Sequence, residues 1–78
     1  MRIIGYRTSK GEYQGHDYDN VLVYVIDKVN SNGFGEFGSY LKVKRDTLPI
    51  NLNDLIGASI IDVNYDKYGK VKDLKIEY

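Results

Sequence analysis

The stretch Val21–Asp27, which reads Val-Leu-Val-Tyr-Val-Ile-Asp, restricts the fold of this chain more than any other. Both faces that it would present as a strand are apolar, and three of its residues are β-branched valines. This composition is typical of a strand that is buried on both sides. In a domain of 78 residues, such a strand requires a sheet that curls around it. We therefore expect a small β-barrel or a tight two-layer β fold.

Length and composition indicate one domain, residues 1–78, without covalent support. A domain of this size buries only about 60% of the surface of its unfolded chain, so a homodimer would widen a thin stability margin. The chain has no cysteine, which excludes disulfides and thiolate metal sites. It also lacks an apolar run near the ~18 residues of a membrane span, and a signal peptide. We expect a cytoplasmic protein that does not associate with membranes.

Alternation and turn residues divide the chain into strands. The segment Thr8–Asn20 is expected to form an extended hairpin arm, because tyrosine and threonine suit strands and glycine and aspartate cluster where turns are needed. Asn30–Gly38 is expected to be a flexible glycine-rich connection. The expected strands are Arg2–Arg7, Val21–Val29, Tyr40–Arg45, Ala58–Tyr65 and Val71–Tyr78.

The segment Asp46–Gly57 breaks the β pattern and predicts one short helical turn. Pro49 is excluded from a central strand, and Asn53 is placed to cap a turn through Asp54–Ile56. Such a turn would close one end of a barrel. The expected fold is therefore all-β, a small five-stranded OB-like barrel with one short helical turn. Alternation turns Lys42 and Lys44 outward. It turns these apolar residues inward: Leu41, Val43, Leu74, Ile76 and Tyr78.

The chain offers little for catalysis. His16, beside Asp17, is the one histidine, and without cysteine most hydrolytic and metal centres are excluded. Gly33–Gly38 has the spacing of a dinucleotide-binding fingerprint, but no helix-forming stretch follows it. We expect a protein that is not an enzyme and that has no metal site and no cofactor.

Aromatic rings interleaved with basic residues form the pattern that predicts binding. Eight tyrosines and two phenylalanines are more rings than so small a core easily holds. Single-stranded nucleic acid stacks its bases on exposed rings, for roughly 1–3 kcal/mol each, while Lys and Arg contact the phosphates. Ordinary strand tyrosines and solubilising lysines explain the same pattern equally well. The candidate contacts on the sheet and its last turn are Tyr24 or Tyr40, Lys42, Lys44, Arg45 and Lys70.

Several short stretches together carry a resemblance to a known family. They are, in order, Gln14–Tyr18 leading into Leu22–Asp27, then Leu41–Lys44, Leu55–Gly57 and Tyr68–Ile76. Their order and spacing resemble the gene V type single-stranded DNA-binding proteins of filamentous phages, which are small dimeric OB-fold proteins.

The resemblance implies that Tyr18 is a stacking ring on the arm and that Lys10 and His16 contact the DNA backbone. It also implies a homodimer that binds single-stranded DNA with little sequence preference, in the replication or transfer of a phage or mobile element. The arm departs from the family in three acidic residues, whose charges repel phosphates: Glu12, Asp17 and Asp19.

A second interpretation belongs to another class of protein. The formal net charge is zero, and a surplus of tyrosine also suits a protein interface. The chain would then be a small phage-type inhibitor of a host or defence protein. An acidic patch would imitate DNA toward a basic partner, and its members would be Asp17, Asp19, Asp62 and Asp66. A third interpretation is a structural module that pairs an edge strand with a partner.

Overall fold

The computed structural model describes residues 1–78, and it is all-β as predicted. Two short 3₁₀ helices, η1 (Arg45–Thr47) and η2 (Leu52–Leu55), are the only helices. Neither combines the length and the apolarity needed to cross a membrane. The strands are β1 (Arg2–Tyr13), β2 (His16–Lys28), β3 (Glu36–Lys44), β4 (Ser59–Tyr65) and β5 (Val71–Glu77).

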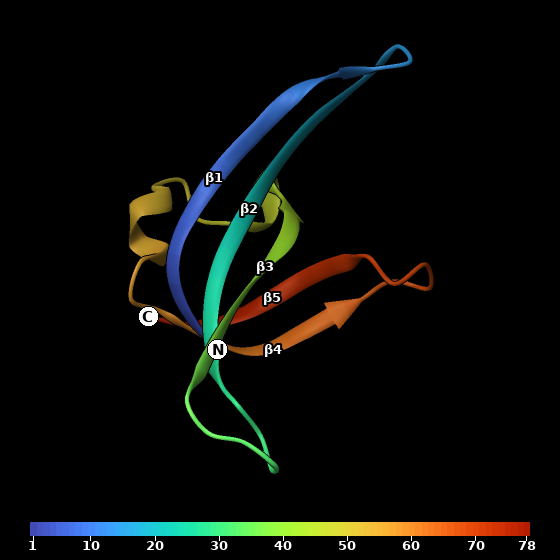
Figure 1. The fold of residues 1–78 in the computed structure, drawn as a ribbon. Coiled ribbons are helices and arrows are strands. Elements are labelled where there is room, and N and C mark those ends of the chain that lie inside the picture. Colours follow the sequence, from blue (N-terminus) through green and yellow to red (C-terminus); the bar gives the residue numbers. More distant parts are fainter.

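The five strands form one sheet in the order β3-β2-β1-β4-β5, with every neighbouring pair antiparallel. The ladder between β1 and β4 consists of the pair Arg2–Ser59, so the β4–β5 hairpin diverges from the rest (Figure 1). The edge strands β3 and β5 approach each other, but no ladder joins them. The predicted closure into a barrel is therefore not confirmed.

β1 and β2 form one long hairpin whose outer part leaves the sheet. Their register is unbroken from Gly5–Tyr24 to Tyr13–His16, whereas β3 pairs with β2 only from Asn20 onward. Residues 10–19, which we call the arm, are therefore a two-stranded ribbon that projects beyond the other elements (Figure 1). The predicted hairpin arm is confirmed, as a continuation of both strands.

The arm ends in a tight turn at Gln14 and Gly15, whose φ angles are 52° and 77°. Two positive φ angles in a two-residue loop define the type I′ turn, whose twist matches that of the strands. The projecting arm makes the molecule elongated, with extents of 46 × 28 × 17 Å. Its radius of gyration is 13.7 Å, compared with about 11.5 Å for a compact domain of this length.

Nine apolar residues form one buried core, and no polar side chain is buried. Leu48 and Leu55 reach it from the connection between β3 and β4, so η1 and η2 lie over the same face of β1–β2–β3 as the β4–β5 hairpin. Such a small core agrees with the thin margin expected for a short chain. The core residues are Ile3, Val21, Val23, Val25, Val43, Leu48, Leu55, Ala58 and Ile60.

The prediction that Val21–Asp27 is buried on both sides is wrong for one side. The three valines are 0–1% exposed, but Leu22, Tyr24 and Ile26, which alternate with them, are only half buried. The core elements pack against one face of β1–β2–β3 and leave the other face of these strands open. The outer side of this strand is therefore partly accessible to solvent.

Three smaller predictions also need correction. β3 begins at Glu36 instead of Tyr40, because its ladder with β2 extends into the predicted loop. There are two helical turns instead of one, and the cap of η2 is Asn51, whose side chain accepts a hydrogen bond from the backbone N–H of Asn53 at 3.0 Å. Tyr78 follows the end of β5 and is exposed instead of facing inward.

Candidate nucleic-acid interface

The register of β1–β2–β3 assigns each side chain to one of two faces, because directly paired residues in neighbouring strands point the same way. The inner face carries the core. The outer face holds the even-numbered residues of β2 and β3 and their partners in β1. From the tip of the arm to the body its rows are Tyr13–His16, Gly11–Tyr18, Ser9–Asn20–Lys44, Arg7–Leu22–Lys42 and Gly5–Tyr24–Tyr40.

Tyrosine rings lie at both ends of this outer face, and basic residues lie between them. Tyr24 and Tyr40 are cross-strand partners whose ring centroids are 6.3 Å apart, with the planes tilted by 58°. The intervening rows carry the exposed side chains of Arg7, Lys42 and Lys44. None of these three is engaged in an ion pair, since the molecule's one salt bridge joins Arg2 to Glu36. They are free to contact phosphates.

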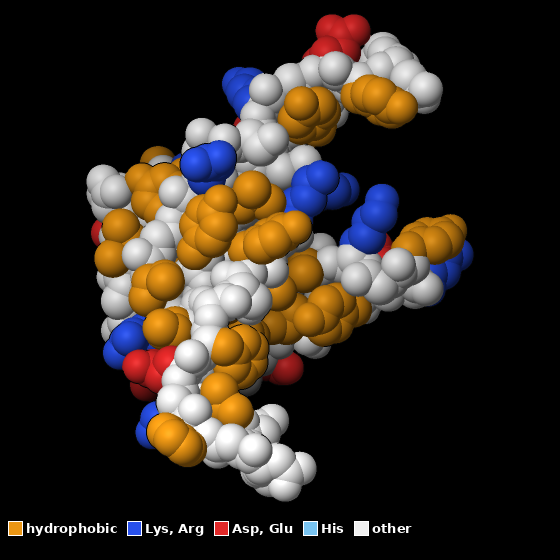
Figure 2. Space-filling view, viewed as in Figure 1, with side chains coloured by type: hydrophobic (Ala, Val, Ile, Leu, Met, Phe, Trp, Pro, Cys, Tyr) orange, Lys and Arg blue, Asp and Glu red, His pale blue; other side chains and the backbone are white.

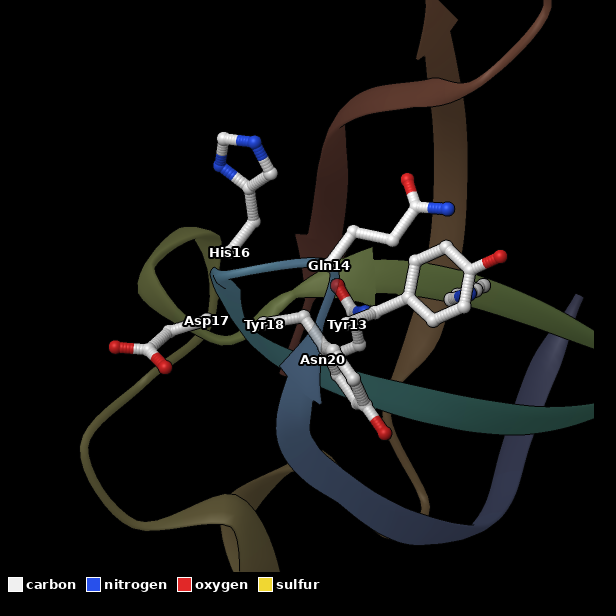
Figure 3. Close-up of a pocket in the computed structure, with 7 residues that line it drawn as sticks. Tyr13, Gln14, His16, Asp17, Tyr18 and Asn20 are labelled. Carbon is white, nitrogen blue, oxygen red and sulfur yellow. The ribbon is translucent and has the colours of Figure 1, made fainter.

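The same register separates the rings of the arm from its acidic residues. Glu12 is paired with Asp17, and Lys10 with Asp19, on the face of the arm opposite the rings. The Asp17 carboxylate points away from the ring of Tyr18 (Figure 3). The acidic side chains of the arm therefore lie farther from the outer face than its rings do.

The ring of Tyr18 packs across the ladder onto Gly11. A Cβ atom at Gly11 would stand 2.6 Å from Tyr18 Oη and 2.9 Å from Cζ, so only glycine leaves room for the ring. This contact leaves Tyr18 38% exposed, whereas Tyr13, near the tip, is 70% exposed. On the arm, the ring of Tyr18 is therefore packed against the backbone, and the ring of Tyr13 is largely exposed.

An open pocket of about 410 Å³ lies along the outer half of the arm and reaches the start of the body. Lys42 contributes from β3, and the other lining residues come from β1, β2 and the turn between them. A ligand here would meet two aromatic rings, an imidazole, amide groups, the Lys42 ammonium group and the Asp17 carboxylate. The rings and the ammonium group suit a base and its phosphate, whereas the carboxylate opposes the phosphate. The pocket is lined by Tyr13, Gln14, His16, Asp17, Tyr18, Asn20 and Lys42 (Figure 3).

The β4–β5 hairpin faces the arm across a recess in which Lys and Arg side chains gather (Figure 2). Its turn exposes Tyr68, with Lys67 Nζ 5.2 Å from the centre of the ring. The backbone N–H groups of Tyr68 and Lys70 donate to Asp66 Oδ1 at 2.8 and 3.0 Å, which shapes the turn. Exposed rings thus lie on the arm (Tyr13 and Tyr18), on β3 (Tyr40) and on the β4–β5 turn (Tyr68).

The structure brings most of the predicted contact residues together on the outer face: His16, Tyr18, Tyr24, Tyr40, Lys42 and Lys44. Lys70 lies apart, on the β4–β5 turn. Lys10 lies on the other face of the arm, opposite Asp19. The guanidinium of Arg45 donates to the backbone carbonyl oxygens of Pro49 and Ile50 at 2.8 and 2.6 Å, so it holds the connection after β3.

Two outer-face residues, Arg7 and Tyr13, were missed as site residues. The signal that finds them is the Gln14–Gly15 turn. A two-residue turn places Tyr13 opposite His16, and counting back in twos from Tyr13 assigns Arg7 to the same face.

The acidic residues of the alternative interpretation fall on separate elements. Asp17 and Asp19 lie on the arm, whereas Asp62 and Asp66 belong to the β4–β5 hairpin. The Asp66 carboxylate is engaged in its turn, and Asp62 Oδ1 accepts a hydrogen bond from the backbone N–H of Val63 at 3.0 Å. This arrangement does not favour a single acidic patch.

Comparison of the chain with protein-family models, with curated proteins and with solved structures finds no match. The gene V resemblance stays a prediction.

Proposed function

We propose that this chain binds single-stranded DNA, with little dependence on sequence, through the outer face of β1–β2–β3 and the arm. The observation that carries the proposal is the register, which gathers exposed rings and unpaired basic side chains on one face. Rings stack on any base, because every base has a π face, and basic side chains track the backbone. The separation of the arm's acids from its rings supports the same function.

The proposed ligand is a single strand because stacking on tyrosine requires unpaired bases. With a formal net charge of zero, the chain has no general attraction to duplex DNA of the kind that basic proteins show. From the resemblance we further propose a homodimer that acts in the cytoplasm in the replication or transfer of a phage or mobile element.

Tyrosine emission provides the first test, because the chain has no tryptophan to obscure it. Titration with oligo-dT at low salt should quench the emission and saturate. With three or four phosphate contacts per subunit, the affinity should fall with salt at a log–log slope of about −2 to −3. A flat titration at low salt contradicts the proposal.

Charge reversal on β3 locates the interface. The double variant Lys42→Glu, Lys44→Glu should lose oligo-dT binding at moderate salt, because it replaces two phosphate contacts with two repulsions. The single variant Lys42→Glu has a matched control in Lys75→Glu, which makes the same charge change at an exposed lysine of β5 paired with Asp62. Lys75→Glu should keep most of the affinity for oligo-dT, whereas Lys42→Glu should lose affinity. Equal losses in these two single variants would mean that the protein responds to net charge and has no defined face.

A further inference from the structure

Two glycines of β1 lie on the outer face, each opposite a tyrosine of β2, and the two pairs differ. In the pair Gly11–Tyr18 the ring covers the glycine, and a Cβ atom would stand 2.6 Å from the hydroxyl oxygen. In the pair Gly5–Tyr24 a Cβ atom at the glycine would meet nothing within 4 Å. The ring of Tyr18 occupies the space above Gly11, whereas the space above Gly5 is open.

Neither a covering side chain nor a positive φ accounts for glycine at position 5. The ring of Tyr24 is paired with Tyr40 of β3, so it does not cover Gly5. Gly5 is absent from the residues with positive φ, and a side chain there is not strained. Glycine inside a strand costs stability, and it often marks a bulge, a tight bend, or the close approach of a ligand or another backbone.

The surroundings of Gly5 suit a planar, anionic ligand. Tyr24 borders the space on the β2 side. Arg7, the next outer-face residue of β1, lies about 7 Å along the strand at ~3.4 Å per residue, and it has no ion-pair partner. A β-bulge at Ile4 precedes Gly5 and leaves Ile4 unpaired and half exposed. Bulges of this kind occur next to binding sites, where they redirect side chains.

We propose that the space over Gly5 is a base-binding subsite. One unpaired base lies on the backbone of Gly5 against the ring of Tyr24, and Arg7 contacts an adjoining phosphate. The inference rests on the proposed function and locates one subsite within it on β1, a strand that none of the sheet contacts predicted from the sequence includes. Because Gly5 has no side chain, it leaves room for the base.

The test fills this space with a side chain that the fold accepts. Valine at position 5 meets no atom through its Cβ and suits a strand, so Gly5→Val should keep or raise the melting temperature. Its affinity for oligo-dT should fall by about 5- to 150-fold, the effect of losing one stacked base. The salt slope should stay that of the wild type, because no phosphate contact is removed. Gly5→Ala should show a smaller loss in the same direction.

Two controls assign the effect to a base. Ser39→Val introduces the same side chain at an exposed position of β3 whose partner, Val25, lies on the inner face, and it should bind as the wild type does. On an abasic strand of equal length, wild type and Gly5→Val should bind equally.

Each other outcome overturns the subsite. Wild-type affinity in Gly5→Val means that no base occupies the space. A loss that follows a lowered melting temperature in both Gly5 variants means that the glycine is structural. If the wild type itself does not bind oligo-dT, the proposed function fails first, and this result is distinguishable from failure of the subsite alone.

Discussion

The two halves of the β1–β2 hairpin share one ladder but differ in what lies behind it. In the body, the inner residues of β2 are valines buried beneath η1, η2, β4 and β5. In the arm, the corresponding positions face solvent and carry charges: Lys10, Glu12, Asp17 and Asp19. The outer face, by contrast, runs through both halves with the same mixture of rings and polar or basic residues. The buried core lies only on the inner face of the body, whereas the proposed binding surface extends over the outer face of both halves.

This difference makes the arm the less stable half. A two-stranded ribbon without a core is marginal in water, and the like charges of Glu12 and Asp17 face each other across this one. The type I′ turn and the packing of the Tyr18 ring on Gly11 stabilise the ribbon. Substitutions in the two halves should therefore change different quantities.

The largest effect is expected in the body. Ile3 is 1% exposed and belongs to the core, so Ile3→Ala should lower the free energy of unfolding by about 2–5 kcal/mol. Tyr13→Ala, at the arm end of the same strand, should change it by less than about 0.5 kcal/mol. Urea denaturation followed by circular dichroism measures both. Similar losses in the two variants would show that the arm contributes to the core.

The next effect concerns binding and belongs to the arm. Tyr18→Ala should weaken oligo-dT binding by roughly 1–3 kcal/mol, the value of one stacked base, with little change in the melting temperature. Tyr78→Ala removes an exposed tyrosine beyond β5 and serves as its control. Fluorescence anisotropy with labelled oligo-dT measures both affinities. If the two variants bind equally well, the arm does not take part.

The smallest effect should distinguish the two faces of the arm. Lys10→Ala should leave the salt slope unchanged, because Lys10 lies with Asp19 on the face away from the rings. Arg7→Ala, on the outer face, should reduce the magnitude of the slope by about 0.7, the share of one phosphate contact on a single strand. A reduction of that size in Lys10→Ala would mean that DNA contacts both faces of the arm.

Much of this arrangement can be read from local pattern. Alternation in Leu41–Lys44 is enough to predict apolar side chains facing inward and lysines facing outward, because side chains of a strand alternate with a period of two. The glycine and aspartate of the arm indicate a hairpin, and the turn at Gln14 and Gly15 determines which arm residues share a face. These features depend on neighbours along the chain, and the all-β class follows from them.

Other features depend on segments that are distant along the chain. Val21–Asp27 is apolar on both faces, and only the packing of η1, η2, β4 and β5 on one side determines that Leu22 and Tyr24 stay accessible. From the sequence, Arg45 is expected to be a free surface cation. In the structure, the connection after β3 folds back, and its carbonyl oxygens accept hydrogen bonds from the Arg45 guanidinium. Nothing in the sequence distinguishes Gly5 from other strand glycines. In the structure, the ring of Tyr24 opposite it packs with Tyr40 of β3 and leaves the space over Gly5 open. A period of two shows that the faces of a strand differ, but which face is covered is a property of long-range contacts.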